Sequence, residues 1–242
     1  GAGKSTLVKI LSGFHQPDAG HIELDGKTVH IANAEHARRL GINVVHQECI
    51  VFDNLTVAEN LFVNARPRER GFVAWGSMRE RTAAILGQLD ADLDPDMTAA
   101  RLSIAQKHVV QIARALTSDA RVLIMDEPTA SLSHREVEDL FRITRKLREA
   151  GCAVLFISHK FEEVFDIADR YTVFRDGTSV GEGALAETDR DALIRLMVGR
   201  PVDQLFPKTP PRLGEELLRV EQLSRAGEFE DVSFSVRRGE IL

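Results

Sequence analysis

The sequence has 242 residues, of which 43% are hydrophobic and 28% charged. These proportions are typical of a soluble globular protein and exclude a disordered or fibrous chain. Thirty-one Lys and Arg against 37 Asp and Glu give a net charge of −6. Nucleic-acid-binding proteins usually carry a basic face, so we expect no nucleic acid partner. No apolar run approaches the ~20 residues of a membrane-spanning helix.

The first predicted elements alternate between helix and strand. Residues 4–13 are predicted to form a helix that ends at Gly13, and residues 21–31 a hairpin that turns at Asp25-Gly26. A short helix between Asn33 and Gly41 and a strand over 42–46 follow. Cys49 and Cys152 lie in or beside apolar runs, and we expect buried, reduced thiols, as in a cytosolic protein.

Four short patterns predict the starts of further helices. Each has Ser or Thr followed three residues later by Glu or Gln, which is the pattern of a capping box. The pairs are Thr56 with Glu59, Ser77 with Glu80, Ser103 with Gln106, and Ser133 with Glu136. Residues 50–105 contain no buried strand and are predicted to be a helical subdomain.

Two continuous apolar runs, 121–125 and 152–157, are typical of strands buried on both faces of a parallel sheet. Helices of suitable length separate them, which predicts βαβ units. The expected fold class is therefore α/β, with a mostly parallel sheet, an antiparallel β hairpin and the helical subdomain.

The stretch GAGKST, residues 1–6, matches the end of a phosphate-binding loop. In such loops the glycines allow backbone N–H groups to approach phosphate, Lys4 would reach the β and γ phosphates, and the Ser5 hydroxyl would bind Mg²⁺. The loop pattern would start three residues before Gly1, so we expect the site to be only partly present. By itself the stretch could also be a glycine-rich turn before a helix.

Asp126 and Glu127 follow the apolar run 121–125, at the edge of a parallel sheet where α/β proteins bind ligands. Asp126 is predicted to hold Mg²⁺ and Glu127 to activate water as a general base. His159 ends the next strand, where it could contact a γ-phosphate. Ser103 begins a helix whose free N–H groups could face a phosphate, although the capping box alone explains this residue.

In this order the motifs resemble the nucleotide-binding domain of ATP-binding cassette (ABC) proteins, which are P-loop NTPases. The segments LSIAQ, IARALTSDARVLIMDEPTASLS and LIRLMVGRPVDQLFPK are similar to the first half of the tandem ATPase of bacterial monosaccharide importers, the ribose, xylose and galactose class. The resemblance covers essentially the whole chain.

The resemblance implies specific roles. The catalytic residues would be Glu127, His159 and Gln47, and Mg²⁺ would be held by Ser5, Gln47 and Asp126. The remaining contacts to ATP would come from Gly1, Ala2, Gly3, Lys4, Ser5, Thr6, Ser103 and Gln106, with Ser103 acting on ATP of a partner domain. The implied partners are transmembrane permease subunits, a second nucleotide-binding domain and, indirectly, a periplasmic sugar-binding protein, at the cytoplasmic face of the bacterial inner membrane.

Two positions depart from the wider family. Its signature has two glycines where this chain carries Ile104 and Ala105, and the loop after Walker B usually ends in Asp where this chain has Ser133. Two other functions share the motifs: an ABC ATPase acting on ribosomes or DNA, and a binding module without hydrolysis. The short connector PKTPPRLG argues against the first, and the intact Asp126-Glu127 pair against the second.

We expect three parts along the chain: a first nucleotide-binding domain over 1–206 that lacks its N-terminal strand, a linker over 207–214, and the beginning of a second domain over 215–242. An incomplete phosphate loop predicts weak ATP binding. A further hypothesis is that residues 217–242, predicted to form two strands, dock on the first domain in place of its missing strands; otherwise they lie apart as a partial sheet.

Overall fold

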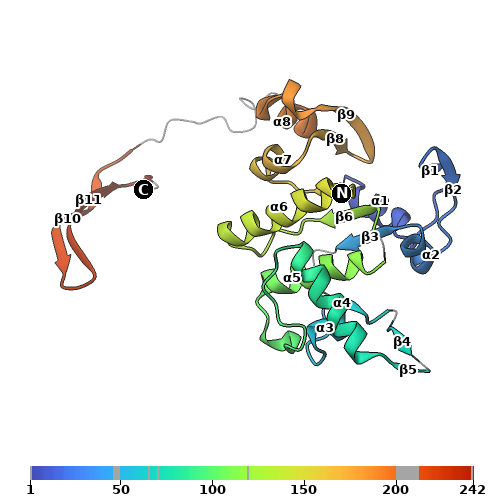
Figure 1. The fold of residues 1–242 in the computed structure, drawn as a ribbon. Helices are drawn as coiled ribbons and strands as arrows, with labels where there is room; N and C mark the ends of the chain where they lie inside the picture. The colour runs from blue at the N-terminus through green and yellow to red at the C-terminus, as the bar shows by residue number, and fades with distance from the viewer. Residues whose placement is uncertain are drawn as a thin grey trace. The chain divides into compact units, whose positions relative to one another are not determined.

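The structure is a computed structural model that describes residues 2–45, 50–64, 66–69, 71–118, 120–199, 213–240 and 242. The chain divides into two compact units, Gly1–Met197 and Val198–Leu242. Figure 1 shows the elements of each unit.

A parallel three-stranded sheet lies at the centre of the first unit. Its strands are β3 (Ile42–Val45), β6 (Val122–Asp126) and β7 (Ala153–Ile157), in the order β3-β6-β7. The predicted parallel strands are therefore confirmed. Alternate residues of β6 point to opposite faces, so Leu123 and Met125 join one apolar core and Ile124 another. All three are almost fully buried, which explains why the run lacks polar positions.

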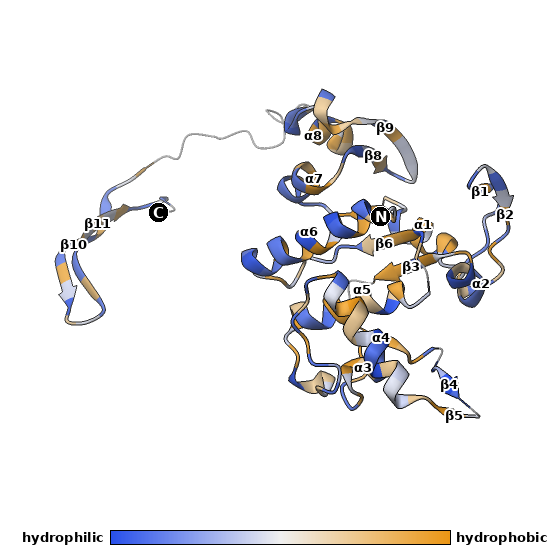
Figure 2. Cartoon of the chain, viewed as in Figure 1, coloured by the Kyte–Doolittle hydropathy of each residue, from blue (hydrophilic) through white to orange (hydrophobic). Residues whose placement is uncertain are grey.

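Helices cover both faces of this sheet. Helix α5 (Ile104–Leu116) and helix α6 (His134–Glu149) pack on the Leu123 face. The other face is covered by α1 (Lys4–Leu11) and α2 (Ala34–Arg39), through Val8 and Ala37. Figure 2 shows both hydrophilic and hydrophobic residues along α6. The apolar residues Leu140, Phe141, Ile143 and Leu147 are buried, which is the pattern of an amphipathic helix.

The predicted hairpin and short helix near the N-terminus are confirmed. Strands β1 (Ile22–Leu24) and β2 (Lys27–Val29) pair antiparallel, and the turn between them places Asp25 and Gly26 at positive φ. Such a turn matches the twist of the strands it joins, which is why Asp-Gly is favoured there. Asn33 caps α2 by accepting a hydrogen bond from the backbone N–H of His36.

In the segment 50–105, helices are the longest regular elements. The segment contains α3 (Val57–Leu61), α4 (Trp75–Gln88), a 3-10 turn η1 (Ala99–Arg101), and a short exposed hairpin of β4 (Arg68–Glu69) and β5 (Phe72–Val73). Helices α3 and α4 and the turn η1 share one core with α5 and the sheet.

One predicted helix start is wrong. The pattern at Ser77 and Glu80 predicts a helix beginning after Ser77, whereas α4 begins at Trp75 with Ala74 as its N-cap. The hairpin β4–β5 ends at Val73, and Ala74 donates to Pro67 O, so the chain enters the helix directly from the hairpin. Ser77 therefore lies inside the first turn, where it cannot act as a cap.

After β7 the chain forms α7 (Phe161–Ile167) and the antiparallel pair β8 (Arg170–Arg175) and β9 (Thr178–Ala184). The 3-10 turn η2 (Leu185–Glu187) and helix α8 (Arg190–Val198) follow. The last residue of α8, Val198, belongs to the second unit. The second unit contains an antiparallel pair, β10 (Glu216–Arg225) and β11 (Phe229–Arg237). The two predicted strands are thus present.

Candidate functional site

The helix that follows the GAGKST stretch begins as predicted. Gly3 is the N-cap of α1 and adopts φ 93, a left-handed conformation that favours glycine, and no side chain caps the helix. The Ser5 and Thr6 hydroxyls are exposed in the first turn. An uncapped helix start beside a lysine and two hydroxyls has the chemistry of an anion site. Gly1 lies outside the described residues, and Ala2 is half-buried just before Gly3.

Lys4 lies beside the end of β7. Its side chain lines a groove of about 690 Å³ together with Leu7, Ile157 and Ser158. Val8, one turn further along α1, packs with Ile124 and Ile157 of the sheet. The start of α1 is therefore positioned by packing of its apolar face on β6 and β7.

Glu127 and His159 are brought together across the ends of β6 and β7. The Glu127 backbone N–H donates to Ile157 O at 2.9 Å, which extends the ladder between the strands by one bond. His159 Nδ1 lies 3.2 Å from Glu127 Oε1. These residues are far apart in sequence, but the carboxyl ends of parallel neighbours meet at one edge of the sheet.

The backbone at Glu127 is strained. Its φ of 47 is uncommon for a residue with a side chain. Such conformations cost about 1–3 kcal/mol and cluster at functional sites. Asp126, the last residue of β6, and Glu127 are both half-buried, so their carboxylates lie at the border between the sheet and solvent.

The residues present fit a phosphate and Mg²⁺ by their chemistry. Lys4 and the uncapped helix start suit polyphosphate, and the oxygens of Ser5 and Asp126 are the hard ligands that Mg²⁺ prefers. Among the described residues, no group of three or more His, Cys, Asp or Glu side chains is arranged to hold a metal ion. Mg²⁺ usually keeps several waters and takes further oxygens from substrate phosphates.

Ser103 and Gln106 form the predicted capping box at the start of α5. The Ser103 N–H donates to Gln106 Oε1 at 2.9 Å, and the Gln106 N–H donates to Ser103 Oγ at 3.2 Å. Within the described ranges neither residue bonds to Glu127 or His159, so the structure does not bring them to that pair. Gln47, predicted to be catalytic and to bind metal, lies outside the described residues.

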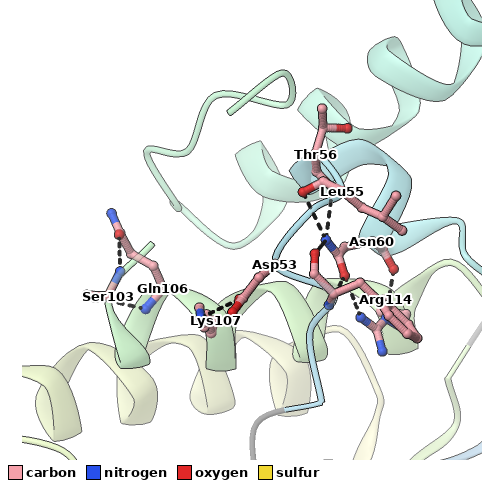
Figure 3. A network of polar contacts seen from close by, with 9 residues as sticks. Asp53, Leu55, Thr56, Asn60, Ser103, Gln106, Lys107 and Arg114 are labelled. Carbon is pink, nitrogen blue, oxygen red and sulfur yellow. Dashed lines mark hydrogen bonds and ion pairs between the residues drawn. The ribbon is translucent and has the colours of Figure 1, made fainter. Parts of the chain in front are cut away.

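Polar contacts tie α5 to the segment that begins at Ile50 (Figure 3). Lys107 Nζ donates to Asp53 Oδ1 at 2.6 Å. Arg114 donates to the backbone oxygens of Asn60 and Ile50, at 2.8 and 3.0 Å. The helix that carries Ser103 is therefore fixed to the segment that follows position 49.

Sequence reasoning missed one buried acid near the site. Glu163 on α7 accepts hydrogen bonds from Thr129 and Ser158, which lie close to Glu127 and His159 in the chain. Its sequence signal was ambiguous, because an acid in the first turn of a helix is also favoured by the helix dipole alone.

Comparisons with known proteins agree with this arrangement. The ABC transporter family matches residues 1–130. A ribose import ATP-binding protein of Agrobacterium fabrum is 51% identical and one of Geobacillus kaustophilus is 46% identical, each across this whole chain. The chain spans about half the length of these relatives, 48% and 49%.

Solved structures show the same fold. A nucleotide-free ATP-binding cassette from an ABC transporter superposes with a TM-score of 0.67 and 25% identity, covering 83% of this chain and 81% of its own. A second ATP-binding cassette reaches a TM-score of 0.69 at 24% identity, over 81% of this chain and 83% of its own. No helix in the described ranges has the length and apolar character to cross a membrane. With more than half of its length matched, the chain belongs to the ABC transporter family.

Proposed function

We propose that this chain forms part of an ATPase subunit that energises import of a monosaccharide through a membrane permease. The observation that carries the ATPase proposal is the placement of Glu127 against His159 at the sheet edge, where Ser158, the residue before His159, lines the same groove as Lys4. The substrate class rests on the relatives, which are named as import proteins for ribose, or for ribose, galactose and methyl galactoside.

The proposal gives each candidate site residue a role toward ATP, Mg²⁺ or the attacking water. Lys4, the N–H groups at the start of α1 and the Thr6 hydroxyl bind the phosphates, while Ser5 and Asp126 hold Mg²⁺. When bound, Mg²⁺ would supply charge that neutralises the phosphates. Glu127 accepts the proton of the attacking water, and His159 contacts the γ-phosphate from the neighbouring strand end. The products are ADP and phosphate.

The partners belong to the proposal as well. We infer permease subunits, a second nucleotide-binding domain and, indirectly, a periplasmic sugar-binding protein, with the ATPase bound at the cytoplasmic face of the inner membrane. Gln47 would sense Mg²⁺ and water and couple to the permease. Gly1, Ala2 and Gly3 would complete the phosphate contacts, and Ser103 and Gln106 would contact ATP held by the second domain.

The test separates binding from hydrolysis in the complete protein that carries this sequence. We expect Glu127→Gln to retain ATP binding and to lose hydrolysis by about 10²-fold or more, the usual contribution of a general base. Lys4→Ala should instead weaken ATP binding itself. Isothermal titration calorimetry measures the binding, and phosphate release measures the turnover.

Glu138→Gln is the matched control, because Glu138 is an exposed acid on α6 that pairs only with His134 among the described residues. Glu138→Gln should leave both ATP binding and ATP hydrolysis unchanged. Near-normal turnover of Glu127→Gln would remove the assigned role of general base.

A further inference from the structure

The carboxylate of Glu163 is buried, with 7% of the residue exposed, and accepts three hydrogen bonds. Thr129 Oγ1 donates to Glu163 Oε2 at 2.7 Å, and Ser158 Oγ donates to the same oxygen at 2.9 Å. Lys160 Nζ lies 2.9 Å from Oε1. Both oxygens of the carboxylate are therefore engaged, from three directions.

These donors belong to the two loops that carry the candidate catalytic residues. Thr129 lies two positions after Glu127, in a turn closed by the Ala130 N–H donating to Glu127 O at 3.3 Å. Ser158 directly precedes His159, and its hydroxyl accepts from the Lys160 N–H at 3.0 Å. Lys160 Nζ also reaches Thr129 O at 3.3 Å. One carboxylate thus joins the turn after β6 to the loop after β7.

The chemistry of this cluster requires an ionised carboxylate. Burial raises the pKa of Glu163, but the hydrogen bonds from Thr129, Lys160 and Ser158 together outweigh burial and lower it. An ionised carboxylate accepts at both oxygens, whereas a glutamine amide accepts at one oxygen and presents donors at the nitrogen. Glutamine in this place could face Lys160 only with its oxygen, which would reverse the bonds to the two hydroxyls and remove the negative charge opposite Lys160.

We propose that Glu163 is a positioning residue that fixes the His159 loop against the Glu127 turn and so maintains the 3.2 Å approach of His159 to Glu127. This inference rests on the proposed ATPase function. Glu163 does not touch the reacting atoms itself. It acts by holding two loops in one relative position, and small displacements of catalytic groups lower the rate strongly.

Hydrogen exchange of the nucleotide-free complete protein tests the positioning without any turnover. In Glu163→Gln we expect faster exchange in the peptides 126–132 and 157–161, which contain the Ala130 and Lys160 amides. Peptides from α5 should not change. The matched control is Glu162→Gln on the same helix turn, since Glu162 is exposed and pairs only with Arg190 within the described part of the chain.

The kinetic arm asks whether Glu163 acts through His159. We expect Glu163→Gln to lower kcat by about 10-fold to 100-fold with little change in KM for ATP. In a His159→Ala background the same substitution should cost no more than about twofold, because residues that act as a unit are not additive. Thr129→Val removes one hydrogen-bond donor to Glu163 with little change in volume. It should also speed hydrogen exchange and lower kcat, but by less than Glu163→Gln does.

The outcomes separate this inference from the function on which it rests. If the unmodified protein does not hydrolyse ATP, the proposed function fails, and the exchange experiment still decides the inference. If it does hydrolyse ATP, unchanged exchange in either peptide overturns the inference. The inference is also overturned if Glu163→Gln lowers kcat equally in the unmodified and His159→Ala proteins and lowers the melting temperature. Glu163 would then be a stabilising residue only.

Discussion

His108 on α5 is a buried side chain without a hydrogen-bond partner at either ring nitrogen, within the part of the chain that the structure describes. A buried polar group left unpaired costs about 1–3 kcal/mol. We therefore expect His108→Leu, which removes two buried unpaired ring nitrogens, to raise the free energy of unfolding by about 1 kcal/mol or more. Urea denaturation at neutral pH measures this change.

His108 also predicts a pH dependence. Burial lowers the pKa of His108, and the charge of Glu136 opposes this only in part. The unfolded chain therefore binds this proton at a higher pH than the folded chain does. This difference in proton binding does not affect stability above the ordinary pKa of histidine, and it destabilises the folded chain as the pH falls through the lowered value.

Measured between about pH 7.5 and 5.5, the fall in unfolding free energy should be smaller in His108→Leu than in the unmodified chain. His15→Leu is the control for replacing a histidine by leucine, because His15 is exposed. If the unfolding free energy of His108→Leu fell with pH as steeply as that of the unmodified chain, His108 would not cause the pH dependence.

At the scale of elements, α3 and α5 are held together by Asn60, which is 0% exposed. Its side-chain oxygen accepts from the Phe52 N–H at 2.8 Å, and its amide nitrogen donates to Phe52 O and Thr56 O, both at 3.0 Å. Arg114 of α5 then bonds to the Asn60 backbone (Figure 3). This network connects segments 54 residues apart.

We expect Asn60→Ala to destabilise the protein by about 3–5 kcal/mol, because the part-buried hydrogen bonds to Phe52 and Thr56 are lost and a cavity remains. Asn64→Ala, a change of an exposed residue just beyond α3, should alter stability by less than about 0.5 kcal/mol. Chemical denaturation of both variants provides the comparison. A loss below about 1 kcal/mol for Asn60→Ala would show that water replaces the network at little cost.

At the scale of the whole molecule, β7 is the last strand of its sheet: among the described strands it pairs with β6 alone. An open strand edge presents N–H and C=O groups that can recruit another strand. Docking of residues 217–242 on the first unit remains a prediction. It requires the apolar side chains of β10 and β11 to be covered by that unit.

Under this prediction, Phe234→Asp in the intact chain should increase hydrogen exchange in the peptide 153–157, because the docked strand would be released. Phe72→Asp is the control, since Phe72 is 81% exposed on β5 and lies in the helical segment. Equal exchange in the Phe234 variant and the unmodified chain would exclude docking at the β7 edge.

Local sequence patterns predicted the elements of this protein well where neighbouring residues decide them. Asp25-Gly26 sets a turn by backbone conformation, and Ser103 with Gln106 forms a reciprocal cap within four residues. Ser77 failed as a cap because the hairpin before it had already begun the helix at Trp75. A capping pattern is necessary for such a cap but does not fix where the preceding chain enters the helix.

By itself the sequence determined the α/β fold class, the strands and the residue types of the candidate site, because burial on two faces and phosphate chemistry both leave local patterns. Only the tertiary structure decided which of these residues meet. The approach of His159 to Glu127 depends on the order of parallel strands, and the Glu163 carboxylate binds Thr129 from 34 residues away. Such contacts depend on where the chain places α7 relative to the turn after β6, and no short-range pattern specifies the distance between two loops.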